Sequence, residues 1–162
     1  MRFEYGEFAV NYHQFERKFC LTLVHGDVAG YRPLVKLHSA CLFAEAFHSL
    51  DCTCGLQLDR TLRSIQMNQR GVVVYSYDEG RGIGLENKIK ALEIERTTGL
   101  DSFEAVRALG LVPDARDYVC ESAALREIGT NAEIILISHS EVKWKSLTAA
   151  GFNVVDTVDV DG

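Results

Sequence analysis

The stretch GLQLDRTLRSIQMNQRGVVVYSY, residues 55–77, joins the two kinds of regular structure from which the fold is built. Leu58, Leu62 and Ile65 recur at the spacing of one face of an amphipathic helix. Gly71 closes this pattern, and the apolar run that follows it is typical of a strand buried on both sides. A helix followed at once by a buried strand predicts a layered α/β structure.

The segments on either side extend this pattern. Residues 3–37 contain short β-like runs such as CLTLVHG and PLVKLH, which predict a small antiparallel meander. Downstream of the buried strand, helical patterns and β-like runs follow one another, in residues 85–99, 102–110, 122–129, 133–138, 140–151 and 152–158. We therefore expect an α/β fold in which a mixed β-sheet has helices on both faces and a β-rich N-terminal part. It should form a single domain over residues 1–162.

The composition narrows the range of functions. The chain has 162 residues and is 47% apolar, which suffices to bury a core without disulfide bridges. No segment reaches the ~18 apolar residues of a membrane span, and the N-terminus lacks the features of a signal peptide. The net charge of -6 and the absence of Lys/Arg runs argue against nucleic acid or a membrane as partners. We expect a soluble cytoplasmic protein, whose cysteines are metal ligands, catalytic groups or core residues.

Three of the five cysteines cluster in CLFAEAFHSLDCTCG, residues 41–55, with the spacing C-x10-C-x-C. Cys41, Cys52 and Cys54 could be zinc ligands, buried unligated thiols or a redox device. We favour a metal site over buried thiols, and redox chemistry least, because C-x-C is a weaker redox motif than C-x-x-C. Three thiolates leave the fourth position of Zn²⁺ to water, as in a catalytic site, unless another side chain closes it. The candidate closing ligands are His38, Cys20 and Cys120. For the two cysteines among them we favour the interpretation as small core residues.

A glycine-rich loop follows the buried strand. Gly80, Gly82 and Gly84 surround Arg81 in EGRGIGL, so that backbone N–H groups and the start of the next helix could bind a phosphate. The alternative is an ordinary turn between a strand and a helix. In that next helix, Lys88 and Lys90 are expected to lie on a solvated face.

A second charged loop, DARDY, covers residues 114–118. It places two acidic residues around Arg116, after Pro113. Such a group is either an exposed ion pair, which would contribute under ~1 kcal/mol to stability, or part of a site. The residues alone leave both possibilities open.

Several motifs taken together resemble the GTP cyclohydrolase II family in order and spacing, from about residue 5 to residue 155: YGEF, HSACL with the cysteine spacing, CGLQL, EGRGIGLENKI, DARDY and LTAAGFNVVD. The resemblance implies a hydrolase that uses a Zn²⁺-bound water to open the imidazole ring of GTP. C8 would leave as formate, and pyrophosphate would be released. The product would be a diaminopyrimidinone ribosyl phosphate, an intermediate of riboflavin synthesis. Mg²⁺ on the polyphosphate and a homodimer are also implied.

The resemblance assigns roles to individual residues. The zinc ligands would be Cys41, Cys52 and Cys54. Asp114 and Arg116 match a general base and a catalytic arginine, which would either attack the α-phosphate or stabilise charge in the transition state. The positions that match substrate-binding residues are Lys36, His38, Ser39, Gln57, Glu79, Gly80, Arg81, Ser102, Ser138 and Lys143. Among these, the Glu79 carboxylate suits the N–H groups of guanine, and Lys143 suits a phosphate.

Other positions depart from the family pattern. Ala40 stands where the family has a glutamate, Asp51 replaces an arginine, Thr53 an aspartate and Leu92 a tyrosine. Because the metal ligands are kept while polar contacts to the substrate change, we expect an active enzyme. One alternative is a variant that stops at the formamide or uses another purine nucleotide. A further alternative is a non-catalytic, zinc-stabilised nucleotide-binding module.

Overall fold

The computed structural model describes residues 1–160, so the last two residues of the expected domain, 161–162, lie outside the described part. Within residues 1–160 the main sheet has six strands in the order β3-β4-β6-β5-β7-β8. In chain order they are β3 (Ala9–Phe15), β4 (Lys18–His25), β5 (Leu34–Ser39), β6 (Gly71–Ser76), β7 (Glu133–Ile137) and β8 (Asn153–Val158). The pairs β3/β4 and β4/β6 are antiparallel, and the pairs β6/β5, β5/β7 and β7/β8 are parallel. A separate small ribbon pairs β1 (Arg2–Phe3) with β2 (Gly6–Glu7).

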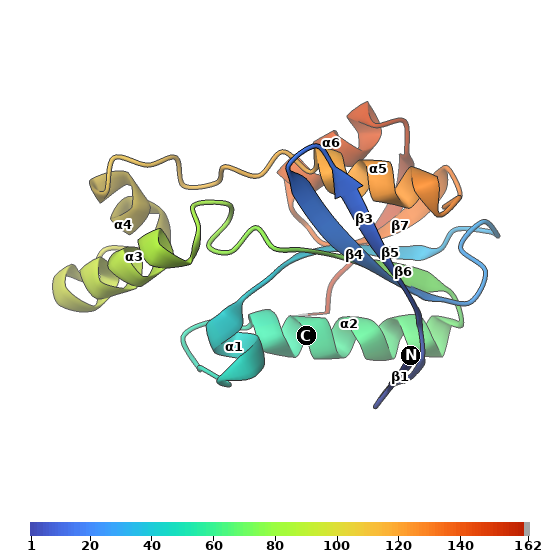
Figure 1. Cartoon of the computed structure of the whole chain (residues 1–162), viewed down its shortest axis with the longest axis horizontal. Helices are drawn as coiled ribbons and strands as arrows, with labels where there is room; N and C mark the ends of the chain where they lie inside the picture. Colours follow the sequence, from blue (N-terminus) through green and yellow to red (C-terminus); the bar gives the residue numbers. More distant parts are fainter. Residues whose placement is uncertain (161–162) are drawn as a thin grey trace.

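Helices cover both faces of this sheet, as Figure 1 shows. They are α1 (Leu42–Ala46), α2 (Cys54–Asn68), α3 (Leu85–Thr98), α4 (Ser102–Ala108), α5 (Val119–Glu127) and α6 (Glu141–Ala149). α2 lies along one face, while α5 and α6 lie along the other, where Leu125 and Leu147 join Leu136 in the largest core cluster. The expected mixed sheet with helices on both faces and a β-rich N-terminal part is therefore confirmed. None of the helices within residues 1–160 has both the length and the apolar character needed to cross a membrane.

The helix and strand of residues 55–77 form as predicted, except that Gln69 rather than Gly71 ends the helix, since Gln69 is the left-handed C-cap of α2 and Gly71 already belongs to β6. Leu62 and Ile65 of α2 are buried and pack with Val73 of β6 in a second core cluster. Val72, Val73 and Val74 are fully buried because β6 lies inside the sheet, between β4 and β5. Burying a side chain of the size of Ile65 contributes about 1.5–3 kcal/mol, so this unit anchors α2 to the sheet.

The predicted antiparallel meander is correct for β3 and β4 but wrong for β5. β3 and β4 form an antiparallel hairpin, in which His13 faces Cys20. β5 instead runs parallel to both of its neighbours, β6 and β7, and residues 34–38 are all buried. A strand covered on both faces is typical of parallel sheets, whereas a strand with one solvated face alternates apolar and polar residues. The run PLVKLH is continuous rather than alternating, and this difference accounts for its place inside the sheet.

α3 and α4 form a lobe beside the sheet, residues 85–108, which we call the α3–α4 lobe (Figure 1). Ala91, Ala105 and Val106 give it a small core of its own. Asp101 begins α4 as a capping box: its side chain accepts hydrogen bonds from the backbone N–H groups of Phe103 and Glu104. The lobe is joined to the sheet by loops at the carboxyl ends of β6 and of α4, so it faces the edge at which open parallel sheets bind ligands.

Candidate active site

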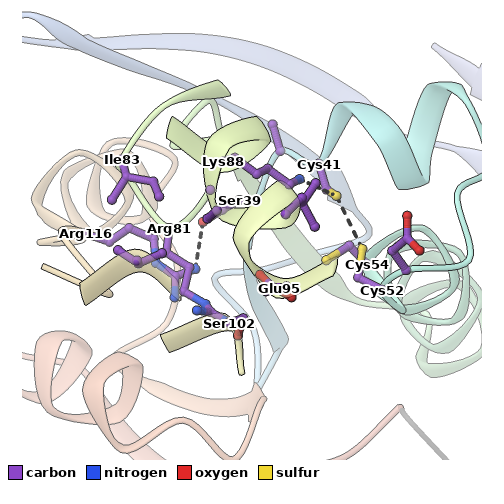
Figure 2. Close-up of a pocket in the computed structure, with 16 residues that line it drawn as sticks. Ser39, Cys41, Cys52, Cys54, Arg81, Ile83, Lys88, Glu95, Ser102 and Arg116 are labelled. Carbon is purple, nitrogen blue, oxygen red and sulfur yellow. Dashed lines mark hydrogen bonds between the residues drawn. The ribbon is translucent and has the colours of Figure 1, made fainter. Parts of the chain in front are cut away.

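A cavity of about 370 Å³ lies between the carboxyl end of β5 and the α3–α4 lobe. Figure 2 shows the cysteines on one side of this cleft and Arg81, Ser102 and Arg116 on the other. Of the predicted site residues, those that line the cleft are Ser39, Cys41, Cys52, Cys54, Gly80, Arg81, Ser102 and Arg116. The cleft therefore brings together residues that are far apart in the chain. Some come from the carboxyl edge of the sheet and others from the α3–α4 lobe.

The three clustered cysteines converge at one end of the cleft. Cys41 follows β5 and is the N-cap of α1, while Cys54 is the first residue of α2. The short helix α1 reverses the chain between them, so that Cys52 and Cys54 return to the neighbourhood of Cys41. The sulfurs of Cys41, Cys52 and Cys54 all lie within 4.8 Å of one another, and those of Cys41 and Cys52 are 3.5 Å apart. Sulfurs on a tetrahedral Zn²⁺ are about 3.8 Å apart, given Zn–S bonds of about 2.3 Å. The donor set and its spacing therefore fit zinc.

The candidates for a fourth, closing ligand are engaged elsewhere. His38 is buried, and its Nε2 lies 2.8 Å from Glu45 Oε1. Cys20 and Cys120 are buried in the core with their sulfurs 3.6 Å apart, as expected of core residues. Within residues 1–160 the metal-binding group consists of three cysteines alone. All three of these cysteines line the cleft, so a metal held by them would lie beside it.

Glu45 supports Cys41 from behind, a role the sequence analysis missed. Its Oε1 accepts a hydrogen bond from the Cys41 N–H at 3.0 Å, and its Oε2 accepts one from the Tyr75 hydroxyl at 2.5 Å. Burial opposes ionisation of Glu45, but the hydrogen bonds from His38 and Tyr75 outweigh it and lower the pKa of the carboxyl group. An acidic residue inside the apolar run LFAEAF was the available signal.

Lys88 also contacts the cysteine cluster, although its expected place was a solvated face. Its ammonium donates to the Cys41 sulfur at 3.0 Å and to Glu79 Oε1 at 2.5 Å. Lys90, for which the same expectation was made, does lie at the surface and pairs with Glu86. Burial raises the pKa of the Cys41 thiol, but the hydrogen bond and the positive charge of Lys88, together with other hydrogen bonds to the sulfur, outweigh it, so that the pKa is lowered overall.

Cys54 behaves differently from Cys41. Its burial and the neighbouring sulfur of Cys52 raise the pKa of the thiol to about 12. The protein alone therefore holds this thiol protonated at neutral pH, and a metal that binds here must displace the proton. Zinc deprotonates coordinating thiols, so metal binding at this cluster should release protons.

Glu79 was expected at the guanine base, but both of its carboxylate oxygens have partners in the protein. Oε1 accepts from Lys88, and Oε2 accepts from the Leu42 N–H at 2.9 Å. The Glu79 side chain is 11% exposed. In this conformation it braces the start of α1 rather than facing the cleft.

The glycine loop turns Arg81 into the cleft. Arg81 itself has a positive φ of 59°, between Gly80 and Gly82, which also have positive φ angles. Its guanidinium donates to Ser102 Oγ at 3.1 Å and stacks over the Phe103 ring at 4.2 Å, so it links the loop to the lobe. The glycine loop is therefore not only a turn between β6 and α3, because it places the Arg81 guanidinium at the wall of the cleft.

Asp114 and Arg116 form a partly buried pair rather than an exposed one. Arg116 donates from Nε to Asp114 Oδ1 at 2.9 Å and from Nη2 to Oδ2 at 2.7 Å, in a two-pronged contact. Its Nη1 donates to Ser39 Oγ at 3.0 Å. Burial disfavours the charged Asp114, but the hydrogen bonds from Arg116 lower the pKa of its carboxyl group. The pair holds the guanidinium at the cleft wall in a fixed orientation.

Lys143 lies close enough to Lys36 and to Arg116 for their charges to interact with its own. Lys143 of α6 donates to the Leu37 carbonyl oxygen at 2.8 Å, and Lys36 of β5 is 5% exposed. Burial, together with the charges of Lys36 and Arg116, lowers the pKa of Lys143 to about 7. Three cationic groups gathered in a partly buried place favour an anion as their partner.

The remaining predicted residues do not line the cleft. Gln57 lies in the first turn of α2 and donates to Thr53 Oγ at 3.0 Å, and Ser138 Oγ accepts from the Ser140 N–H. The departures Ala40, Asp51 and Leu92 do line the cleft. So does Glu95, which the sequence analysis did not single out. Figure 2 shows it on the same helix as Lys88, α3, but further along that helix.

One helical stripe explains which α3 residues face the cleft. Lys88, Ala91, Leu92 and Glu95 all line it or contact the cysteines, and they recur at intervals of three and four residues. The spacing itself can be read from the sequence. That these residues face a cleft could not be predicted, because they are partly charged and partly apolar and so do not form a hydrophobic face.

Comparisons with known proteins agree with the motifs. A family model described as GTP cyclohydrolase II matches residues 1–159. A GTP cyclohydrolase-2 of Actinobacillus succinogenes is 39% identical over 161 residues, which cover 98% of this chain and 73% of that protein. A GTP cyclohydrolase-2 of Escherichia coli O9:H4 (strain HS) is 40% identical over 139 residues, which cover 85% of this chain and 70% of that protein. These matches extend over most of the chain.

Proposed function

This chain belongs to the GTP cyclohydrolase II family and is a hydrolase that acts on GTP, and we propose that it does so in the cysteine-lined cleft with zinc as its metal. The reaction would open the imidazole ring of GTP by hydrolysis. It would release C8 as formate, together with pyrophosphate, and yield a diaminopyrimidinone ribosyl phosphate. The observation that carries this proposal is a group of three converging thiols that line the same cavity as Arg116.

Cys41, Cys52 and Cys54 would hold the zinc. When bound, zinc supplies a Lewis acid and lowers the pKa of a coordinated water towards neutrality, which suits attack on C8. The protein contributes the orientation of the ligands: Glu45 holds the Cys41 backbone, and α2 begins at Cys54. The wall of the cleft opposite the cysteines then places the ribose and phosphates.

Arg116 would stabilise negative charge on the α-phosphate as pyrophosphate leaves. Burial acts to lower the pKa of this guanidinium, but its hydrogen bonds to Asp114 and the acidic groups around it together outweigh burial and raise the pKa. A guanidinium that stays protonated is a poor nucleophile and a good partner for a phosphate. Both Asp114 oxygens are occupied by Arg116, which supports an orienting role for the aspartate beside that of a general base.

Cationic groups near Arg116 would bind the polyphosphate. Lys143 lies near both Arg116 and Lys36, and Arg81 with Ser102 extends the polar wall towards the lobe. The polyphosphate would carry Mg²⁺. Further substrate contacts are proposed at Ser39 and Gly80, which line the cleft, whereas His38, Gln57, Glu79 and Ser138 do not line it. A cytoplasmic location and a homodimer complete the proposal.

A specific observation favours a second candidate, a variant with an altered substrate or product. Ala40, Asp51 and Leu92, which differ from the family pattern, all line the cleft. A carboxylate at position 51 in place of an arginine makes the cysteine end of the cleft less favourable for phosphate. Such an enzyme would stop at the formamide or accept another purine nucleotide. The non-catalytic module has less support, because the candidate closing ligands are engaged elsewhere.

The test is product analysis with purified, zinc-loaded protein. Incubation with GTP should release one formate and one pyrophosphate per GTP consumed, with the mass of the pyrimidine product confirmed by mass spectrometry. Parallel incubations with GDP, GMP and ATP would reveal the altered-substrate variant. A ring-opened product that retains the formyl group would favour the formamide variant. Zinc-loaded protein that opens the ring of none of these nucleotides would refute the enzyme proposal.

A further inference from the structure

Lys88 connects the cysteine cluster to the glycine loop. Its ammonium lies 3.0 Å from the Cys41 sulfur and 2.5 Å from Glu79 Oε1, and it sits over the Phe43 ring at 5.5 Å. The Lys88 side chain is 18% exposed. The ammonium therefore has two acceptors and an aromatic face around it, which leaves it little capacity to bind a substrate phosphate as well.

Glu79 fixes this arrangement from the other side. One of its oxygens holds Lys88, and the other accepts from the N–H of Leu42, the residue after Cys41. The same short segment of chain is thus held twice, once at the sulfur and once at the next backbone amide. Glu79 and Lys88 form an ion pair without net charge, so the pair acts on the cysteine cluster as a dipole. The ammonium is its positive end, and it is the end in contact with the Cys41 sulfur.

We propose that Lys88 is a positioning residue for the zinc ligand Cys41, and that Glu79 acts as its anchor. The inference rests on the zinc part of the proposed function. The N–H···S hydrogen bond orients the sulfur towards the other two thiols and withdraws electron density from it. A thiolate that donates less to the metal leaves the metal a stronger Lewis acid. The lysine thus compensates in part for the electron-rich set of three sulfurs.

The test compares metal binding in matched variants. Lys88→Met removes the ammonium and keeps the length of the side chain. Lys90→Met, two residues along the same helix, is the control because Lys90 pairs with Glu86 at the surface. Zinc affinity is measured by chelator competition, and Co²⁺ in place of zinc reports the metal–sulfur bonds through its thiolate charge-transfer band.

We expect Lys88→Met to weaken zinc binding about 10- to 100-fold, the range typical of residues that support metal ligands. The cobalt band should move to lower energy, because a sulfur without its hydrogen bond gives up electrons more easily. Lys90→Met should match the wild type in both measurements. Lys88→Arg, which keeps a cationic donor, should recover most of the affinity, and Glu79→Gln should shift both readouts in the direction of Lys88→Met.

The outcomes separate this inference from the proposed function. If the wild type binds one metal per chain and Lys88→Met keeps its affinity and band position, the inference is overturned while the zinc proposal stands. If the wild type binds no metal at the cysteines, both are overturned. Should Lys88→Met fail to fold, as judged by circular dichroism, Lys88→Arg and Glu79→Gln decide. Wild-type zinc affinity and band position in Glu79→Gln would overturn the role of Glu79 as anchor. Zinc affinity in Lys88→Arg that stays far below that of the wild type would overturn the role of the hydrogen bond.

Discussion

Replacing Lys143 by methionine should remove a pH dependence that pyrophosphate binding shows in the wild type. Burial and the charges of Lys36 and Arg116 lower the pKa of Lys143 to about 7. At that pKa the amine is about 10% neutral at pH 6 and about 90% neutral at pH 8. An anion bound beside it favours the ammonium form, so binding takes up a proton at the higher pH.

The size of the effect follows from this linkage. If the bound state keeps Lys143 protonated throughout, affinity falls about tenfold between pH 6 and pH 8, or ~1.4 kcal/mol. Proton uptake at pH 8 is about 0.9 per pyrophosphate, against about 0.1 at pH 6. Affinity has to fall rather than rise with pH, because only the protonated amine attracts the anion. Above the lowered pKa of Lys143 most of the amine is neutral and must first take up a proton.

Isothermal titration calorimetry in two buffers of different ionisation enthalpy measures both quantities. The difference between the wild type and Lys143→Met cancels the protonation of pyrophosphate itself. Lys145→Met is the matched control, because Lys145 lies on the same helix with its side chain 66% exposed and paired with Glu141. Equal proton uptake and equal pH dependence in the wild type and Lys143→Met would refute the reasoning.

Three further outcomes are expected. Arg116→Lys keeps the charge but loses the two-pronged contact with Asp114 and should slow pyrophosphate release at least about 100-fold; near-normal release would remove both roles proposed for the arginine. Glu121 is 1% exposed, and burial raises the pKa of its carboxyl group. Stability should therefore fall as the pH rises above the ordinary pKa of a glutamate, and Glu121→Gln should abolish that slope in urea unfolding; an unchanged slope would contradict it. Asp101→Ala removes the cap of α4 and should cost about 1 kcal/mol in urea unfolding without altering zinc content, whereas unchanged stability would speak against the cap.

The spacing of apolar residues along the chain predicted most helices and strands, because this spacing depends on which side of each element is buried. The spacing of Leu58, Leu62 and Ile65 predicted α2, and the valines after Gly71 predicted β6. The position of β5 could not be predicted in the same way. Its pairing partners are β6 and β7, and the second of these lies about a hundred residues further along the chain, a relation that no local pattern encodes.

The site was predictable where spacing and chemistry coincide, as in the three cysteines, whose convergence the structure confirms. Lys88 was not, because its neighbour Lys90 has the same residue type in the same helix and only the placement of the lobe distinguishes them. Glu45 was missed for a related reason. Its partners His38 and Tyr75 come from two adjacent strands, and their meeting depends on the sheet order.

If the cysteine cluster holds zinc with a fourth position open to the cleft, X-ray absorption at the zinc edge of the metal-loaded protein should detect water at that position. We expect three sulfurs at about 2.3 Å and one oxygen at about 2.0 Å. A shell of four sulfurs, or of three sulfurs and a histidine nitrogen, would mean a closed structural site and would contradict this expectation.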